Sequence, residues 1–336
     1  MPDRPLSSAA ILGTGSFGTA LARLLAPRLN EVVMIGRDPA VAESINATRH
    51  NSRYLAGVEL PENISASTSL AEAARHPLVL FCVPTAATRD SAGALAASSL
   101  PVDSVVLSCA KGIERNTGER MSEILREKLP ANPVAVLSGP NHAEEIAACL
   151  ATCAVIGTED DLLAKRLQEL FTTPYFRSYT SDDVAGIEYG GAIKNVYAIA
   201  AGIAAGLRLG DNAIAALVTR ALAEMTRLGT VLGGRVETFA GLSGVGDLIA
   251  TCFSKHSRNN RVGLALGQGK TLEEATSSLG MVAEGVPNTL SIHETAQRAG
   301  VRTPIIDAVH AILYRDMPAA RALHELLNRD PRPEND

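Results

Sequence analysis

Short apolar runs alternate with amphipathic stretches through the first half of the chain. Most of the runs are rich in β-branched residues, as the buried strands of parallel sheets are. They occupy Ala9–Leu12, Val32–Ile35, Leu78–Val83, Ser104–Ser108, Val134–Leu137 and Thr152–Ile156. Helical stretches such as Phe17–Arg28 and Gly118–Lys128 lie between them. This alternation predicts an α/β domain over residues 1–180, built on a Rossmann-like doubly wound parallel sheet.

The pattern changes near Tyr179, after which apolar positions recur at helical spacing with little strand signal. Ser181–Asp183 offers a helix N-cap before a long helix that runs through Lys194. Further helices are expected at Ala213–Leu228 and onward from Thr271, Thr289 and Pro304. We therefore expect an all-α C-terminal domain over residues 181–330, followed by a frayed polar tail at 331–336.

Composition narrows the range of partners. The 336-residue chain is 46% hydrophobic and 20% charged, and it has a formal net charge of −5. This acidic balance, together with the absence of tryptophan, argues against a nucleic-acid-binding protein. No secretory signal precedes Gly13, no apolar segment is long enough to span a bilayer, and the cysteines are scattered as in a reducing compartment. We expect a cytoplasmic protein with no nucleic-acid partner and no stable membrane insertion.

A glycine-rich turn follows the first predicted strand and opens the first predicted helix. Its sequence is Gly13-Thr14-Gly15-Ser16-Phe17-Gly18. Gly13 permits a tight turn, Gly15 lets a pyrophosphate approach the backbone, and Gly18 lets the helix pack closely on the strand. The N-terminus of the helix would face the phosphates. In this context the turn predicts a dinucleotide site rather than a chance glycine-rich loop.

The residues after the second predicted strand bear on the choice of cofactor. Asp38 stands at the distance from the glycines at which an acidic residue binds the ribose hydroxyls of NAD. Arg37 precedes it, and a guanidinium there could bind the 2′-phosphate of NADP. A solvated surface pair of the two residues is the alternative. We favour NADP as the cofactor, with NAD also accepted.

Two loops follow neighbouring predicted strands at the carboxyl edge of the sheet, where open α/β sheets bind ligands. Lys111-Gly112 is the first, and a plain surface lysine is the alternative to a functional one. Ser138–Glu145 is the second, and a helix that starts near Asn141 would offer backbone N–H groups and an amide side chain. His142 and His256 have no partners at metal-ligand spacing, so we expect no metal site.

The second half of the chain holds one lysine in an apolar helix and one carboxylate in a glycine-dense turn. Burial of Lys194 would lower its pKa, which suits a general acid or base. A lysine that snorkels to solvent fits the same pattern equally well. The turn Gly241–Leu248 delivers Asp247, and the Ser257-Arg258-Asn259 cluster that follows is typical of a site for a small anion.

These motifs resemble those of the bacterial NAD(P)-dependent sn-glycerol-3-phosphate dehydrogenases, nearly from end to end. The shared motifs are Gly13–Ala20, Arg53–Leu55, Phe81–Pro84, Lys111-Gly112, Ser138–Pro140, Lys194–Val196, Gly244–Leu248, Ser257–Asn259 and Val282–Gly285. The first is generic, whereas the later ones are specific in their order and spacing. The resemblance implies a 6-phosphogluconate-dehydrogenase-like fold, in which a Rossmann domain precedes a helical one. Asn141 departs from the family pattern, in which we expect Ser or Thr.

The resemblance also implies roles for individual residues. Lys194 would be the proton acceptor and Asp247 its polar partner. The substrate positions would be Lys111, Gly139, Asn141, Asp247, Ser257, Arg258 and Asn259. The cofactor positions, with the glycines of the turn, would be Gly13, Gly15, Ser16, Phe17, Gly18, Arg37, Lys111, Ala143, Arg258, Val282 and Glu284.

The implied reaction is the reversible reduction of dihydroxyacetone phosphate to sn-glycerol 3-phosphate by NADPH or NADH, which supplies glycerophospholipid synthesis. The partner would be a small phosphorylated triose or glycerol, and the apolar helical domain favours a homodimer. A 3-hydroxyacid dehydrogenase or ketopantoate-type reductase, with carboxylate substrates, is a second possibility. A non-catalytic NADP-binding redox sensor is a third, although it would need neither a buried lysine nor an anion clamp.

Overall fold

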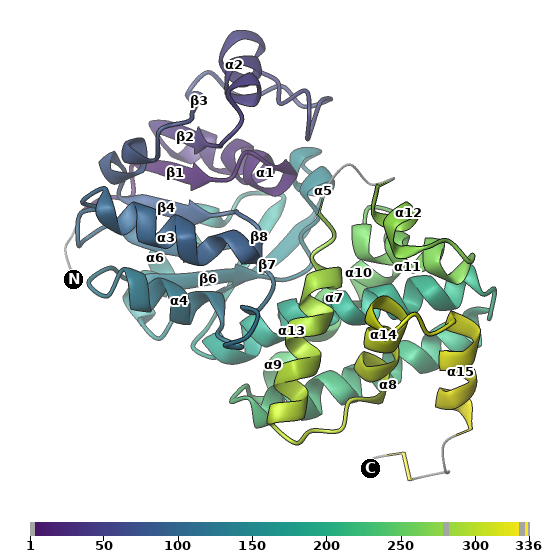
Figure 1. Cartoon of the computed structure of the whole chain (residues 1–336). Coiled ribbons are helices and arrows are strands. Elements are labelled where there is room, and N and C mark those ends of the chain that lie inside the picture. The colour runs from purple at the N-terminus through teal and green to yellow at the C-terminus, as the bar shows by residue number, and fades with distance from the viewer. Residues whose placement is uncertain (1–3, 278–281, 329–332, 335–336) are drawn as a thin grey trace.

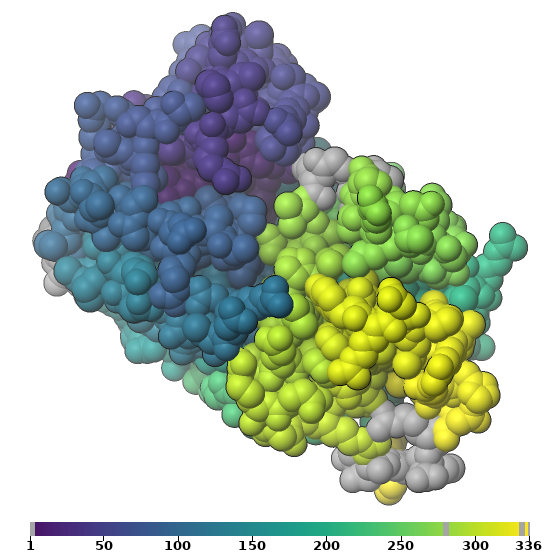
Figure 2. Space-filling view, viewed as in Figure 1, coloured from purple at the N-terminus to yellow at the C-terminus, as the bar shows by residue number. Residues whose placement is uncertain are grey.

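The computed structural model describes residues 4–277, 282–328 and 333–334. A sheet covered by helices forms one part of the molecule, and a cluster of helices forms the other (Figure 1). In the space-filling view the two parts are in broad contact, blue against green and yellow (Figure 2). Most of the frayed tail expected at 331–336 lies outside the described residues.

An eight-stranded sheet is the framework of the first part. Its strands are β1 (Ser8–Leu12), β2 (Glu31–Ile35), β3 (Ile64–Ser67), β4 (Leu78–Phe81), β5 (Val105–Ser108), β6 (Val134–Ser138), β7 (Thr152–Gly157) and β8 (Phe176–Ser181). They are ordered β3-β2-β1-β4-β5-β6-β7-β8 across the sheet. From β3 to β6 all neighbours are parallel. The predicted Rossmann-like, doubly wound sheet is therefore confirmed.

The sheet differs from the prediction toward its edges. β6 and β7 pair antiparallel, with Leu137 opposite Ile156, so the sheet is not parallel throughout. The apolar pattern also misses β3 and β8, which are the two edge strands. An edge strand has a neighbour on one side only and tolerates polar residues, such as Ser65 and Ser67 in β3 and Arg177 in β8. Apolar runs therefore predict the central strands and not the edges.

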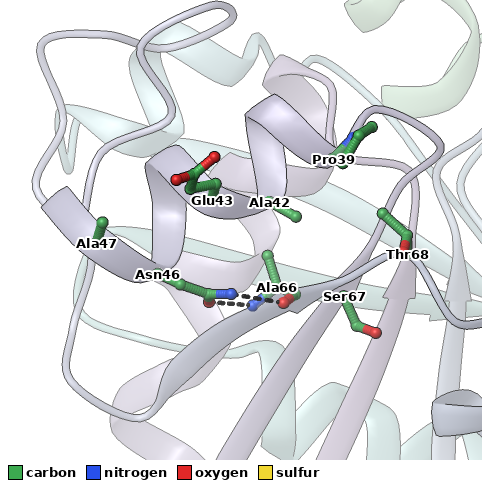
Figure 3. Close-up of a pocket in the computed structure, with 8 residues that line it drawn as sticks. All are labelled: Pro39, Ala42, Glu43, Asn46, Ala47, Ala66, Ser67 and Thr68. Carbon is green, nitrogen blue, oxygen red and sulfur yellow. Dashed lines mark hydrogen bonds between the residues drawn. The ribbon is translucent and has the colours of Figure 1, made fainter.

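The outer edge of β3 is closed by one side chain from α2 (Pro39–Thr48). The Asn46 amide donates to the Ala66 carbonyl at 2.8 Å and accepts from the Ala66 N–H at 2.8 Å (Figure 3). The amide takes the place of a neighbouring strand and leaves fewer free pairing groups at the edge. An open hollow of about 610 Å³ lies beside it, between α2 and β3.

Helices and short helical turns cover both faces of the sheet. Besides α2 they are α1 (Ser16–Leu25), η1 (Ala26–Arg28), η2 (Leu70–Arg75), η3 (Thr85–Ala87), α3 (Thr88–Ala97), α4 (Met121–Lys128), α5 (Ala143–Ala147) and α6 (Asp161–Phe171). Ile11 and Leu21 belong to the apolar core on one face. Val79 and Leu95 belong to the core on the other. The strands are thus buried on both faces, which explains their nearly continuous apolar sequence.

The second part of the molecule is helical. Its elements are α7 (Val184–Gly206), α8 (Asp211–Val231), α9 (Val236–Phe239), the π-helical turn η4 (Leu242–Gly246), α10 (Asp247–Phe253), α11 (Arg258–Gly267), α12 (Leu272–Ser277), α13 (Gly285–Arg298), α14 (Pro304–Tyr314) and α15 (Ala319–Leu327). The central helix is α7, of which nearly every residue is buried. Its predicted cap is confirmed, because Asp183 accepts from the Gly186 N–H at 2.9 Å.

Glycines bring α11 closer to α7 than side chains would allow. A Cβ on Gly202 of α7 would lie 2.1 Å from the Asn260 carbonyl oxygen. A Cβ on Gly263 of α11 would lie 2.0 Å from the Ile199 carbonyl oxygen. Both contacts are with backbone, which cannot rotate away as a side chain can. The close approach fixes the position of α11, and with it the residues at its N-terminus.

Apolar packing is continuous between the two parts. Val136 of the sheet shares one buried cluster with Val184 and Ile187 of α7. The chain passes from sheet to helices between β8 and α7, within this shared packing. Because the packing is continuous across this junction, the division of the chain into domains at residues 1–180 and 181–330 is our proposal.

One stretch of the helical part is apolar enough to match a membrane-crossing helix. Val236–Phe253 has 18 residues, a mean hydropathy of 1.2 and 39% of its residues buried. The expectation that no segment reaches this length and composition was therefore wrong. The stretch consists of α9, η4 and α10 in succession and contains the buried Asp247. Core helices of folded proteins pass the same criterion, so it is weak support for membrane insertion.

Replacing Gly263 by alanine should destabilise the protein, because the added methyl group meets the Ile199 backbone. We expect the free energy of unfolding to fall by about 2 kcal/mol or more, as at other overpacked sites. Gly93 of α3 is the matched control, since a Cβ there meets nothing within 4 Å. Gly93→Ala should be neutral or stabilise by up to about 1 kcal/mol. Urea denaturation measures both, and a wild-type midpoint for Gly263→Ala would contradict the packing argument.

Candidate active site

The glycine-rich turn after β1 has the geometry that its sequence implies. Gly13 has a φ of +116°, and a Cβ there would lie 2.5 Å from the Cys82 carbonyl oxygen. A Cβ on Gly18 would lie 2.1 Å from the Gly13 carbonyl oxygen, so α1 packs directly on the turn. Nothing lies within 4 Å of a Cβ on Gly15, so the backbone there is open to a ligand. The turn therefore fits a dinucleotide pyrophosphate at the N-terminus of α1.

The turn is held by residues outside the glycine motif. Asn51 is fully buried and donates to the Thr14 carbonyl at 2.7 Å and to Thr19 Oγ1 at 2.8 Å. Ser16 Oγ donates to the Tyr54 carbonyl at 2.9 Å. The segment after α2 thereby fixes the conformation of the turn.

Arg37 and Asp38 have separate surroundings at the end of β2. Arg37 is exposed, whereas Asp38 caps α2 by accepting from the Ala40 N–H at 3.0 Å. Asp38 also forms an ion pair with Arg53 at 2.6 Å. Its carboxylate is thus engaged by a helix cap and by a second arginine. Arg37 therefore presents an exposed guanidinium at the end of β2, beside a carboxylate that is already engaged.

A buried carboxylate joins two lysines at the carboxyl edge of the sheet. Asp247 is 2% exposed and accepts from Lys194 Nζ at 2.5 Å and from Lys111 Nζ at 2.8 Å. Lys194 is 5% exposed and also donates to Thr251 Oγ1 at 2.7 Å. Of the two alternatives for this lysine, burial is therefore confirmed. With both lysines protonated, the cluster has an excess of positive charge.

Burial and charge together set the protonation of this cluster. Burial lowers the pKa of Lys194 to about 8, against the opposing attraction of Asp247 and with a further lowering by Lys111. Burial opposes ionisation of Asp247, but the two lysines outweigh it and hold the pKa of that carboxyl below its usual range. An amine with a pKa near physiological pH can both donate and accept a proton.

Lys111 is positioned by residues of the helical part. Its carbonyl accepts from Asn195 Nδ2 at 3.1 Å and from Asn288 Nδ2 at 2.8 Å. A Cβ on Gly112 would lie 2.5 Å from Asn288 Oδ1, so the Asn288 amide fills the space of a side chain there. The Lys111 ammonium also donates to the Gly139 carbonyl at 2.8 Å. Its backbone and its charged end are therefore both fixed.

The loop after β6 contributes to the same cluster. Asn141 is buried, and its Oδ1 accepts from Lys111 Nζ at 2.7 Å. Gly139 has a φ of +121°, a conformation that favours glycine. The helix expected near Asn141 begins at Ala143, and His142 is its N-cap.

Two side chains of the Ser257-Arg258-Asn259 cluster form hydrogen bonds within the fold. Ser257 Oγ caps α11 by accepting from the Asn260 N–H at 3.2 Å. Asn259 donates to Asn195 Oδ1 at 2.9 Å. It also accepts from the Gly285 N–H at 2.9 Å. Both residues fix the start of α11 and connect it to neighbouring helices.

The guanidinium of Arg258 has more hydrogen-bond donors than its contact within the fold uses. One guanidinium nitrogen donates to the Val282 carbonyl at 2.8 Å, which leaves further donors of the planar fork. Val282 is 51% exposed. Burial raises the pKa of Glu284, which is close enough to Arg258 for the two charges to interact. These three residues therefore lie together near the N-termini of α11 and α13.

The predicted residues fall into groups along the carboxyl edge of the sheet. Those joined by direct contacts are Lys111, Gly139, Asn141, Lys194 and Asp247. Across the described ranges, no hydrogen bond connects this group directly to the Gly13–Gly18 turn or to Arg37. The group and the turn nevertheless lie at the same carboxyl edge of the sheet, because the turn follows β1 and Lys111 follows β5. No group of three or more His, Cys, Asp or Glu that could hold a metal ion occurs within the described residues.

Sequence reasoning misses three residues on which the cluster depends. Thr251 lies one helical turn after Asp247, so the i, i+4 spacing could have indicated it. Asn195 directly follows Lys194 and belongs to one of the motifs shared with the family. Asn288 has no signal in the sequence, because a neutral amide that binds a backbone carbonyl 177 positions away leaves no local pattern.

Replacing Asp247 by asparagine should leave the buried Lys194 ammonium and the partly buried Lys111 ammonium without their shared counter-charge. We expect the free energy of unfolding at pH 7 to fall by about 3–5 kcal/mol. The folded pKa of Lys194 is already below its unfolded value, so stability rises with pH between the two values. The variant lowers the folded pKa further, and its deficit should shrink from pH 7 to pH 9. Urea denaturation at both pH values is the measurement, and a deficit that grows with pH would contradict this reasoning.

The control for that variant is Asp182→Asn, which removes an ion pair with Arg235 at the surface. Exposed pairs contribute little, so this variant should unfold like the wild type. A loss as large as that of Asp247→Asn would mean that the effect is not specific to the buried cluster.

Sequence comparison matches most of the chain to one family. The profile described as NAD-dependent glycerol-3-phosphate dehydrogenase N-terminus matches residues 8–164, and the corresponding C-terminus profile matches residues 183–324. A glycerol-3-phosphate dehydrogenase (NAD(P)+) from Streptomyces coelicolor is 46% identical over 97% of this chain and 98% of that protein. Another of that name, from Clostridium tetani, is 43% identical over 96% of this chain and 93% of that protein.

Solved structures agree with the sequence match. A crystal structure of glycerol-3-phosphate dehydrogenase from Coxiella burnetii has a TM-score of 0.93 at 37% identity, covering 96% of this chain and 99% of that one. A ketopantoate reductase from Ralstonia eutropha has a TM-score of 0.63 at 20% identity, covering 94% of this chain and 100% of that one, which shows a shared fold alone. The two profiles and the full-length relatives leave one conclusion: the chain belongs to the NAD-dependent glycerol-3-phosphate dehydrogenase family.

Proposed function

We propose that the chain reversibly reduces dihydroxyacetone phosphate to sn-glycerol 3-phosphate, with NADPH preferred and NADH accepted. The observation that carries this proposal is the buried contact of Lys194, Asp247 and Lys111 at the sheet edge that also bears the dinucleotide turn. The names of the full-length relatives support the choice of substrate and cofactor. A protein that only binds a dinucleotide has no use for a buried lysine whose pKa is lowered to about 8.

Lys194 is the general acid of the reduction and the general base of the oxidation. The cofactor, when bound, supplies or accepts the hydride at C2 of the substrate. The Lys194 ammonium donates a proton to the carbonyl oxygen as that oxygen gains negative charge. In the reverse direction the neutral amine accepts the hydroxyl proton. Asp247 and Thr251 hold Nζ in place, and Lys111 adds positive charge that stabilises the developing alkoxide.

Arg258 binds the substrate phosphate together with the first N–H groups of α11. The first N–H groups of a helix lack intrahelical acceptors and favour anions, and α11 begins at Arg258. Ser257 and Asn259 act by holding the start of α11, because their side chains are engaged in hydrogen bonds of the fold. Gly139 and Asn141 line the other end of the substrate.

The remaining residues of the proposal contact the cofactor. The Gly13–Gly18 turn would hold the pyrophosphate in the open space beside Gly15, and Ser16 and Phe17 would be among the residues that contact it. Arg37 binds the 2′-phosphate of NADP. The other cofactor contacts are Lys111, Ala143, Arg258, Val282 and Glu284.

The second candidate function is that of a 3-hydroxyacid dehydrogenase or ketopantoate-type reductase, whose substrates are carboxylates. The shared fold with a ketopantoate reductase keeps it open, since an arginine binds carboxylate as well as phosphate. The N-terminus of α11 beside Arg258 favours the more highly charged phosphate, and so do the full-length relatives.

In the cell the reaction would supply glycerophospholipid synthesis from a small phosphorylated substrate in the cytoplasm. The enzyme would act as a homodimer. The apolar composition of the helical part favours this assembly.

The decisive test is the oxidation of NADPH with dihydroxyacetone phosphate, compared with ketopantoate as the carboxylate substrate. Wild-type protein should turn over the phosphate substrate, whereas Lys194→Ala should bind NADPH and lose kcat by about 10²- to 10⁴-fold. Binding is followed by cofactor fluorescence and turnover by absorbance. Near-normal kcat in the variant would exclude Lys194 from the role, and preference for ketopantoate would favour the second candidate.

Replacing Arg37 by serine should raise KM for NADPH on the order of tenfold, because a charge-assisted contact with the 2′-phosphate is lost. The KM for NADH should stay near the wild-type value, since NADH lacks that phosphate. Arg75→Ser is the control, because Arg75 forms an exposed ion pair with Glu72 and precedes β4, at the opposite edge of the sheet. Steady-state kinetics with both cofactors separate the two variants. Equal rises in both KM values for Arg37→Ser would contradict the assignment.

A further inference from the structure

A second buried ion pair joins the helical part of the molecule to the sheet part, on the same helix as Lys194. Glu188 of α7 is 6% exposed, and its carboxylate accepts from Arg120 Nη1 at 3.0 Å. It also accepts from the N–H group of Ser122 at 2.8 Å and from the Ser122 hydroxyl. Arg120 is the N-cap of α4, and Ser122 lies in its first turn. A carboxylate of the helical part is therefore bound at the N-terminus of a helix of the sheet part.

The loop that carries Lys111 ends at Arg120. Ile113 and Arg120 form an antiparallel β-bridge, and the Glu114 N–H donates to the Glu119 carbonyl at 2.8 Å. These contacts fix the two ends of the loop to each other, shortly after Lys111. A contact that holds Arg120 therefore also holds the backbone that leads to Lys111.

One face of α7 contacts this loop at both of its ends. Glu188, Gly191 and Asn195 share that face, because they follow one another at spacings of three and four residues. Glu188 binds the Arg120 end of the loop. At the other end, a Cβ on Gly191 would lie 3.5 Å from Lys111 Cγ, and Asn195 Nδ2 donates to the Lys111 carbonyl at 3.1 Å.

Stability does not explain why a charged residue makes this contact. Burial raises the pKa of Glu188, against the attraction of Arg120, so desolvation offsets much of what the pair gains. Replacing a buried ion pair by apolar residues is often neutral or stabilising. What the carboxylate provides is direction, because its hydrogen bonds hold Arg120 and Ser122 in one geometry relative to α7.

We propose that Glu188 is a positioning residue, which acts through Arg120 to hold Lys111 at its distance from Lys194. The inference rests on the proposed function, in which Lys194 donates the proton and Lys111 stabilises the developing alkoxide. Glu188 itself touches neither substrate nor cofactor. Its effect is on the chemical step, because the two ammonium groups must meet the same substrate oxygen.

The distance between the two lysines has a measurable consequence. The titratable groups that face Lys194 are Lys111, His142, Asp247 and Cys252. Those that face Glu188 are Arg120, Glu123 and Tyr189. The charge of Lys111 lowers the pKa of Lys194, so a Lys111 side chain that lies farther away would let this pKa rise. A contact that only stabilised the fold would leave it unchanged.

The test is Glu188→Gln, which keeps the size of the side chain and removes its charge. With dihydroxyacetone phosphate, kcat should fall by about tenfold while the KM for NADPH stays near the wild-type value. Lys194 must be protonated for the reduction, so turnover falls as the pH rises through its pKa. In the variant this fall should lie at higher pH. Steady-state kinetics from pH 6 to pH 10 measure both effects.

Glu123→Gln is the matched control, because Glu123 pairs with the same arginine from within α4 and not from α7. It should keep the wild-type kcat and pH profile. Arg120→Gln breaks the contact from the sheet side and should also shift the profile to higher pH. Glu188→Asp keeps the charge but is too short to reach both partners, and it replaces Glu188→Gln if that variant does not fold.

The direction of the shift separates position from charge. A direct effect of the lost charges on Lys194 would move the profile to lower pH in Glu188→Gln and to higher pH in Arg120→Gln, and that result would overturn the inference. An unchanged profile in the folded variants would overturn it as well. Wild-type protein that reduces dihydroxyacetone phosphate at no pH would instead overturn the proposed function on which the inference rests.

Discussion

The Asp247 carboxylate is the interaction on which the site depends, because it lies between two ammonium groups from different parts of the molecule. Lys111 follows a strand of the sheet, whereas Lys194 lies within α7. Without the negative charge the two cations would repel each other where water screens little. Desolvation offsets much of the attraction in a buried ion pair, so such a cluster adds little stability to a fold. Its physical consequences are geometry and proton affinity, and these are what catalysis requires.

Glycines, which have no side chain, allow the Asp247 carboxylate to reach this position. A Cβ on Gly190 of α7 would lie 2.6 Å from the Ser243 carbonyl oxygen, and a Cβ on Gly244 would lie 2.0 Å from the Phe239 carbonyl oxygen. The turn η4 therefore lies against α7 backbone to backbone, and Asp247 follows it at the start of α10. The glycine-dense sequence that suggests an anion-binding loop is better explained by this packing. Its contribution to the site is the delivery of one aspartate.

What the sequence can predict is what local chemistry decides. The central strands, the Asp183 cap and the three glycines of the dinucleotide turn each follow from neighbouring residues, and each is found in the structure. The edge strands β3 and β8 are not predicted, because an edge position tolerates polar residues and the apolar pattern is lost there. Whether Lys194 is buried or reaches solvent cannot be predicted either, because its counter-charge Asp247 lies 53 residues away in the sequence. The same limit applies to Asn259, whose partners belong to α7 and α13.

Neutral amides connect the proposed phosphate site to the lysines. Asn195 donates to the Lys111 carbonyl and accepts from Asn259, which in turn accepts from the Gly285 N–H. This chain of hydrogen bonds sets the distance between the start of α11 and Lys111, so that a substrate held by its phosphate meets the proton donor in one geometry. Carboxylates in those places could not donate to the Lys111 carbonyl or to each other, so the chain of hydrogen bonds would break. They would also raise the pKa of Lys194 and reduce the positive charge that a developing alkoxide needs, and amides avoid both effects.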